Sequence, residues 1–187
     1  MSKNIDYLGS VSFPWHKFFK LLSNSSTKVT HGHRSNVLEG RTEKQKKIFS
    51  LYSNVSLNFN NYTNDSFIDL IPKNFWNKFN IKKDGAYIQI LKHKPCTFTA
   101  PHTDTYDNFL KKAGKASSNK NKNQIIRIWI PMTDPKFGHA LFVGDSVAYN
   151  LKKGTVLKFN HKIYHSACNA GYEDRYILTI TGWKNGQ

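Results

Sequence analysis

Cysteine is scarce in this chain, and so are long apolar runs. Two cysteines, Cys96 and Cys168, cannot build a disulfide framework, and they lack the spacing of a thiolate zinc site. No stretch of about 18 apolar residues exists, so the sequence predicts no membrane-spanning helix. The first residues lack the apolar core of a signal peptide. We therefore expect a cytoplasmic protein with no membrane partner.

Acidic residues and arginine are also few. The chain has 12 Asp and Glu against 28 Lys and Arg, a net charge of +16, yet only Arg34, Arg41, Arg127 and Arg175 are arginines. A basic balance favours nucleic acids or acidic partners. Proteins that read bases rely on the two-pronged contacts of arginine, however. A nucleic-acid partner is therefore possible but not favoured over a small-molecule or peptide substrate, and the oligomeric state is not predicted.

The length of 187 residues fits one domain, spanning 1–187. Residues 1–82 have apolar positions at helical spacing separated by irregular stretches, and we expect helices there that pack outside a sheet. Residues 83–187 instead alternate with a period of two, which is typical of short strands in a sandwich or barrel. The expected strands are 86–91, 125–130, 139–143, 154–159 and 175–180. In the first of these, Tyr87 and Gln89 share one face.

His102 and Asp104 form the first half of a candidate metal site. Residues two apart in an extended segment point to the same side, so both can bind one ion. Such a pair is common by chance and carries little weight alone. His165 supplies a third ligand, and two histidines with one carboxylate make the facial triad of non-haem iron(II) oxygenases. His161, four residues earlier, is the rival for the third position.

Arg175 lies ten residues after His165. The turn at 169–171 is expected to return the chain antiparallel and so bring Arg175 beside the His165 imidazole. A guanidinium binds a carboxylate through two parallel hydrogen bonds. Arg175 is therefore the candidate anchor for the far carboxylate of 2-oxoglutarate, whose keto-acid end would occupy open positions at the metal.

A family resemblance covers residues 101–183. The matching blocks are Pro-His-Thr-Asp at 101–104, Arg-Ile-Trp-Ile-Pro at 127–131, Leu-Lys-Lys-Gly at 151–154 and His-Ser-Ala-Cys-Asn-Ala-Gly at 165–171. Together they resemble the aspartyl/asparaginyl β-hydroxylase group of 2-oxoglutarate oxygenases and the related bacterial proline hydroxylases. The resemblance implies a mainly β fold, a double-stranded β-helix (cupin-like, jelly-roll barrel).

The resemblance also implies roles for individual residues. His102, Asp104 and His165 would bind the iron, Arg175 would anchor 2-oxoglutarate, and Arg127 falls where the family has a second basic residue near the co-substrate. Two features depart from the animal members. Those lack the carboxylate ligand that Asp104 supplies, and they carry a histidine where this chain has Trp129.

The implied function is an iron(II)- and 2-oxoglutarate-dependent dioxygenase. It would use O2 to hydroxylate an amino-acid side chain, free or in a polypeptide, with release of succinate and CO2. Two alternatives stay open: the same chemistry on a nucleic-acid base, and a cupin-like basic binding module without catalysis. The Lys-rich segment 111–122 follows the metal motif directly, and it is either a lid over the pocket or a solvated insertion.

Overall fold

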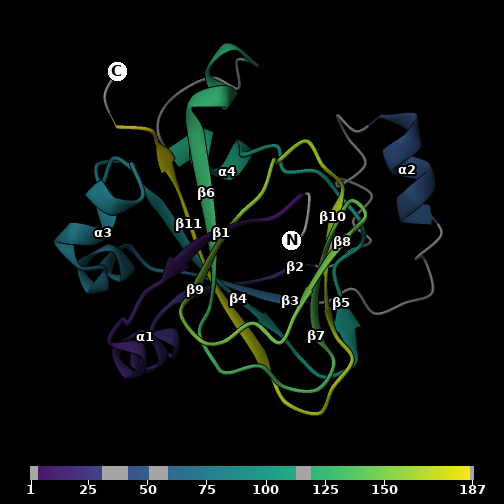
Figure 1. Ribbon diagram of the computed structural model, residues 1–187, viewed down its shortest axis with the longest axis horizontal. Helices are drawn as coiled ribbons and strands as arrows, with labels where there is room; N and C mark the ends of the chain where they lie inside the picture. Colours follow the sequence, from purple (N-terminus) through teal and green to yellow (C-terminus); the bar gives the residue numbers. More distant parts are fainter. Residues whose placement is uncertain (1–3, 31–41, 51–58, 113–118, 186–187) are drawn as a thin grey trace.

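Two antiparallel sheets face each other in the computed structural model, which describes residues 4–30, 42–50, 59–112 and 119–185 (Figure 1). The larger sheet has the order β1-β9-β6-β11-β4-β3-β2, and the smaller has the order β5-β10-β7-β8. The strands are β1 (Asp6–Ser10), β2 (Ser26–Thr30), β3 (Phe59–Thr63), β4 (Tyr87–His93), β5 (Thr97–Phe98), β6 (Ile125–Pro131), β7 (His139–Val143), β8 (Ser146–Tyr149), β9 (Thr155–Lys158), β10 (His165–Asn169) and β11 (Arg175–Trp183). The helices are α1 (Trp15–Leu22), α2 (Glu43–Ser50), α3 (Lys73–Lys78) and α4 (Asp107–Lys112), with 3₁₀ turns η2 (Asp65–Leu70) and η3 (Asn119–Gln124).

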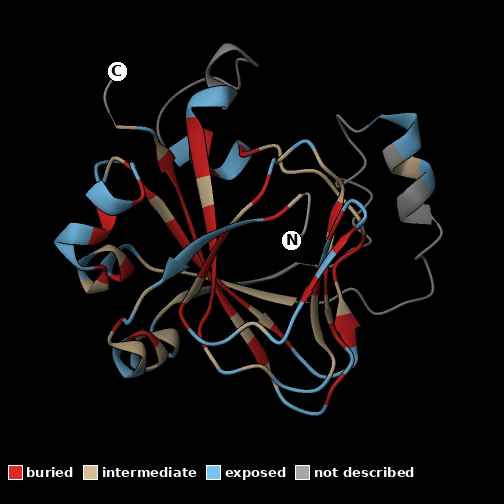
Figure 2. Ribbon diagram, in the orientation of Figure 1, coloured by how far each residue is buried: buried red, intermediate tan, exposed pale blue. Residues whose placement is uncertain are grey.

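The central strands are apolar on both faces because both faces are covered. In β6, Trp129 points inward to the cluster between the sheets, whereas Ile128 and Ile130 point outward. The outward face packs against α1, η2 and α3, which bury Phe18 and Phe67 completely. Figure 2 shows the resulting pattern, with buried residues along the central strands and exposed ones on the outer sides of the helices. The expected double-stranded β-helix with N-terminal helices outside is thus confirmed.

The first 82 residues contain more strand than the sequence predicted. Strands β1, β2 and β3 extend both edges of the larger sheet, with β1 paired to β9 and β3 paired to β4. All five side chains of β1 are exposed and those of β3 are half-buried, so neither strand shows the apolar alternation on which the prediction relied. Hydrogen bonding to a sheet edge, rather than burial, holds these segments extended.

The expected pairing around Arg175 is wrong. Strands β10 and β11 do not form a hairpin: β10 lies in the smaller sheet between β5 and β7, and β11 lies in the larger sheet between β4 and β6. The turn at 169–171 therefore crosses from one sheet to the other. Arg175 pairs with His93 of β4 and lies near Cys168, close to the end of β10 that is remote from His165.

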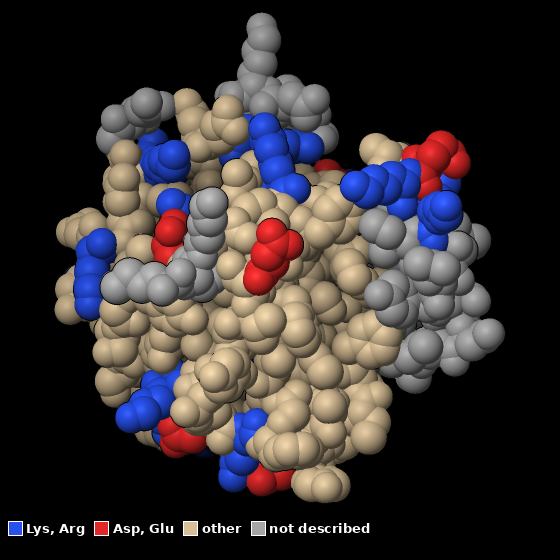
Figure 3. Space-filling model, turned by 45° about the vertical axis from the view of Figure 1, so that its right-hand side comes forward, with Lys and Arg blue, Asp and Glu red and all other residues tan. Residues whose placement is uncertain are grey.

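The surface charge is unevenly spread. On the face that Figure 3 turns to the viewer, charged side chains gather along the upper rim, around α2 and along the lower edge, and the broad surface between them carries few. The outer face of the smaller sheet exposes Phe142, Val147 and Tyr149. In the described part of the chain, no helix is long and apolar enough to cross a membrane.

Candidate active site

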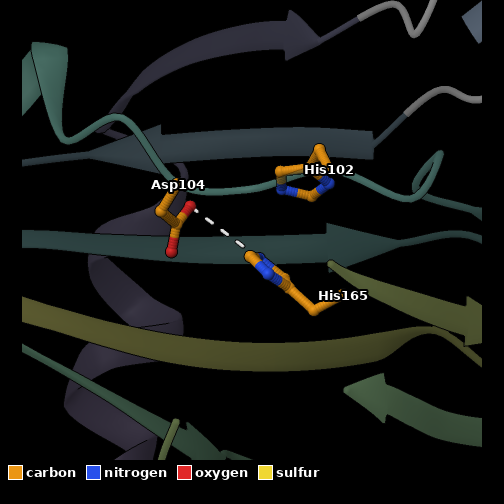
Figure 4. A group of neighbouring side chains, drawn as sticks. All are labelled: His102, Asp104 and His165. Carbon is orange, nitrogen blue, oxygen red and sulfur yellow. Dashed lines mark ion pairs between the residues drawn. The ribbon is translucent and has the colours of Figure 1, made fainter. Parts of the chain in front are cut away.

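His102 and His165 are direct cross-strand partners. Each backbone N–H donates to the other's carbonyl, at 3.0 and 2.9 Å, and their ring centroids lie 4.4 Å apart. The Asp104 N–H donates to the His161 carbonyl at 3.0 Å, which keeps residues 102–104 extended beside residues 161–165. The side chains of His102, Asp104 and His165 converge on one point (Figure 4), and one ligand atom from each lies within 4.8 Å of the others.

The rival histidine does not join this group. The His161 ring stacks on Tyr106, with centroids 4.9 Å apart. Among the described residues, His102, Asp104 and His165 make the single cluster with metal-binding spacing. The distances therefore favour His165 over His161 as the third metal ligand.

Backbone carbonyls orient both imidazoles. His102 Nδ1 lies 2.7 Å from the Ala100 carbonyl oxygen, and His165 Nδ1 lies 3.1 Å from that of Ile163. A carbonyl can only accept, so each Nδ1 must carry the proton and each Nε2 keeps a lone pair. Such a hydrogen bond fixes the tautomer of a metal-binding histidine. Both rings are therefore prepared to bind an ion through Nε2.

Aromatic walls keep His165 neutral. Its ring is packed by Phe159 and Trp129, at centroid distances of 4.7 and 6.1 Å, and the residue is 1% exposed. Burial first, and then the neighbouring His102, lower the pKa of His165 to about 3. Metal binding requires a deprotonated ligand nitrogen, so at neutral pH this imidazole loses no proton when an ion binds.

Asp104 is held by Arg127. Arg127 Nη1 lies 2.7 Å from Asp104 Oδ1, and Arg127 Nη2 donates to Gln89 Oε1 at 3.1 Å. Burial alone would raise the pKa of Asp104, but Arg127, His165 and His102 outweigh it and hold that pKa below its usual value. The carboxylate is therefore ionised at neutral pH. This ion pair could not be predicted from residue spacing, because only the fold brings β6 beside residue 104.

Arg175 lies further down the same barrel. It is 4% exposed, its Nη1 has no hydrogen-bond partner, and burial lowers its pKa to about 10, so it stays charged at neutral pH. Trp129, which touches His165, is the register partner of Thr179. Arg175 lies four residues from Thr179 along β11, or about 13 Å. An arginine side chain and a five-carbon diacid, laid end to end, can bridge the distance from the Arg175 backbone to the level of His165.

Arg175 also contributes to a pocket at the end of the barrel away from the histidine pair. The pocket is lined by the loop after β6, the start of β7 and the start of β11. His139 shares this pocket, and its Nε2 donates to the Glu173 carbonyl at 3.3 Å. This histidine is a rim residue and does not belong to the metal cluster.

Unpartnered buried atoms of the barrel lumen fit a metal and an anion. In the described residues, buried side-chain atoms without a hydrogen-bond partner include His165 Nε2, Trp129 Nε1, Arg127 Nε and Arg175 Nη1. Folded proteins rarely leave buried polar atoms unsatisfied. The lone pair of His165 Nε2, which faces the Asp104 carboxylate and the His102 imidazole, suits a divalent cation. The unpartnered N–H donors deeper in the barrel lumen, the space between the two sheets, suit a carboxylate. The residues present thus fit both iron(II) and 2-oxoglutarate.

Three comparisons place the chain among known proteins. A family model described as aspartyl/asparaginyl beta-hydroxylase matches residues 24–185. A search of the curated proteins found no match. Among solved structures, an oxidoreductase of the 2OG-Fe(II) oxygenase family from Burkholderia pseudomallei aligns with a TM-score of 0.52 at 11% identity, covering 91% of this chain and 79% of that one.

Two further solved structures align more loosely. A predicted oxalate decarboxylase from Thermotoga maritima has a TM-score of 0.45 at 11% identity, covering 87% of this chain and 96% of that one. A cupin 2 conserved barrel domain protein from Rhodopseudomonas palustris has a TM-score of 0.44 at 4% identity, covering 87% and 74%.

Proposed function

This chain belongs to the aspartyl/asparaginyl beta-hydroxylase family, and from that premise we propose that it is an iron(II)- and 2-oxoglutarate-dependent dioxygenase. Its substrate is an amino-acid side chain, free or within a polypeptide. The observation that carries the proposal is the convergence of His102, Asp104 and His165, with one ligand atom from each within 4.8 Å.

His102, Asp104 and His165 would hold the metal together. His102 and His165 offer Nε2, because their Nδ1–H groups are committed to backbone carbonyls. Asp104 offers a carboxylate oxygen that Arg127 holds in place. Three protein ligands leave the remaining positions open for co-substrates. When bound, iron(II) and 2-oxoglutarate supply the oxidising chemistry, in which O2 is consumed, succinate and CO2 are released, and a C–H bond of the substrate is hydroxylated.

The rest of the lumen binds and shields the co-substrate. Arg175 supplies a fixed positive charge for the far carboxylate, and burial strengthens that ion pair. Arg127 Nε remains free to donate to the co-substrate while Nη1 holds Asp104. Trp129 and Phe159 exclude water from one side of His165.

A screen of succinate release tests the function and its alternatives together. The protein is incubated with iron(II), ascorbate, O2 and 2-oxoglutarate, and with panels of amino acids, peptides and oligonucleotides. Stimulation by an amino acid or peptide, lost in Asp104→Ala, supports the proposal. Stimulation by nucleic acid alone would favour a base substrate. Failure to bind iron(II) and 2-oxoglutarate at all would favour a non-catalytic binding module.

A further inference from the structure

His93 faces the barrel lumen at the end of β4. Leu91, two residues earlier on the same face, belongs to the cluster between the sheets. The register places His93 directly opposite Arg175 of β11 on one side and opposite Phe59 of β3 on the other. Its side chain has no solvent exposure. The strand predicted here ended at residue 91, whereas β4 continues to His93, so this histidine was not assigned to the sheet.

Two contacts fix the His93 ring and backbone. The ring stacks on Phe59, with centroids 5.2 Å apart and planes inclined by 29°. Asn169 Nδ2, from β10 in the other sheet, donates to the His93 carbonyl at 2.9 Å. The imidazole is thus held between the two sheets at the level of Arg175, and it cannot swing out to find water.

Both ring nitrogens of His93 are buried without a hydrogen-bond partner, and so is Arg175 Nη1. A neutral imidazole carries one donor and one acceptor, and a guanidinium carries five donors. The acceptor nitrogen of His93 could pair with Arg175, yet no hydrogen bond joins them. Two buried register partners with unsatisfied donors point to a shared acceptor that is not part of the protein.

The charge of this pair suits one carboxylate. Burial first, and then the positive charges of Arg175 and His139, lower the pKa of His93 to about 3. His93 is therefore neutral at neutral pH, and Arg175, with a pKa of about 10, is charged. One positive charge plus one neutral N–H donor matches a singly charged group with several lone pairs.

We propose that His93 binds 2-oxoglutarate together with Arg175, donating its ring N–H to the same far carboxylate that the guanidinium pairs with. This assignment rests on the proposed function, since the carboxylate is that of the co-substrate. It gives the tail of 2-oxoglutarate a second contact at the level of Arg175, whereas Arg127 contacts Asp104. Co-substrates without the far carboxylate gain nothing from His93.

Calorimetric titration of the manganese(II)-loaded protein measures the binding of the co-substrate without turnover. The ligands are 2-oxoglutarate and 2-oxopentanoate, which has the same keto-acid end but no far carboxylate. His93→Phe removes both nitrogens and can keep the aromatic stack on Phe59, and His93→Asn restores a side-chain N–H donor. We expect His93→Phe to weaken 2-oxoglutarate about tenfold, as for one buried hydrogen bond. It should leave the affinities for 2-oxopentanoate and manganese(II) unchanged, and His93→Asn should recover part of the loss.

Long-range ¹H–¹⁵N spectra of the wild-type imidazoles give a readout that needs no variant. The His93 ring N–H should move downfield when 2-oxoglutarate binds and stay in place when 2-oxopentanoate binds. Equal affinity for 2-oxoglutarate in wild type and His93→Phe, or an unmoved His93 resonance, overturns the role of His93. Equal weakening of both ligands does so too, because it indicates a merely structural role. If the wild type does not bind 2-oxoglutarate, both the proposed function and the role of His93 are contradicted. If Arg175→Gln weakens 2-oxoglutarate binding but His93→Phe does not, only the role of His93 is contradicted.

Discussion

Arg127 of β6, in the larger sheet, reaches Asp104 with its Nη1 2.7 Å from Oδ1, so a residue distant in the sequence holds a metal-ligand candidate. The same guanidinium is braced by Gln89 at 3.1 Å. Asp104 is thereby ionised and oriented before any metal arrives. This contact gives Arg127 a positioning role beside the co-substrate role that the family resemblance implied.

Loss of Arg127 should therefore weaken metal binding. Partners that orient a metal ligand typically contribute about 10- to 100-fold in affinity. We expect Arg127→Gln to lower manganese(II) affinity by that factor, because burial raises the pKa of Asp104 once the ion pair is gone. Gln89→Ala is the matched control, since it removes the brace but leaves the ion pair. If Arg127→Gln raises only the 2-oxoglutarate requirement, Arg127 serves the co-substrate and not Asp104.

Arg175→Gln should raise the dissociation constant of 2-oxoglutarate far more than that of the metal. Truncating one partner of a buried charge pair costs on the order of 2–5 kcal/mol. Arg175→Lys keeps the charge without the two-pronged geometry and should fall between wild type and Arg175→Gln. Titrations with manganese(II) and then 2-oxoglutarate measure both constants. A 2-oxoglutarate affinity that Arg175→Gln leaves intact would transfer the anchor to Arg127.

The stability of the metal-free protein should fall as the pH drops, in part through His93. The pKa of His93 is about 3 in the folded chain and about 6.5 in the unfolded chain. Between pH 3 and pH 6.5 the unfolded chain therefore binds a proton at this residue that the folded chain does not. The stabilisation is complete above pH 6.5 and is lost progressively toward pH 3. The free energy of unfolding of the wild type should decrease by about 1.4 kcal/mol per pH unit more than that of His93→Phe. Urea unfolding at pH 6 and pH 5 with a chelator present measures both slopes, and parallel slopes would mean that His93 titrates normally.

Much of this site follows from local pattern, and the rest depends on the fold. The alternation of Ile126, Ile128 and Ile130 predicted β6, and a spacing of two predicted the pairing of His102 with Asp104. The side of β4 shared by Tyr87 and Gln89 also contains His93, so alternation could have identified it as a lumen residue. The Asp104–Arg127 ion pair and the crossing between β10 and β11 could not be predicted. Both depend on which sheet each strand joins, and residue spacing does not encode that.

The Lys-rich segment 111–122 remains a predicted lid, and its residues 113–118 lie outside the described part of the chain. Its two ends are near the site: Lys112 pairs with Asp65 and lies over the Tyr87 ring, and the charge of Lys122 helps to lower the pKa of His161 after burial and Lys162. We expect substrate, but not 2-oxoglutarate alone, to slow tryptic cleavage in this segment.

Charge reversal separates a lid from an inert insertion. Lys111→Glu with Lys122→Glu should weaken an acidic substrate and leave the slow turnover of 2-oxoglutarate without substrate unchanged. Lys153→Glu, which follows β8 and lies away from this segment, is the matched control. Unchanged cleavage with substrate, together with unchanged kinetic constants in the double variant, would make the segment a solvated loop.

The most direct test of the account is the visible charge-transfer band of the iron(II) complex with 2-oxoglutarate, followed anaerobically. The account predicts a weak band that saturates at one iron per chain in the wild type and in His161→Ala, and that is absent in His165→Ala. A band that survives in His165→Ala and disappears in His161→Ala would contradict the ligand assignment, and no band in the wild type would contradict the proposed chemistry itself.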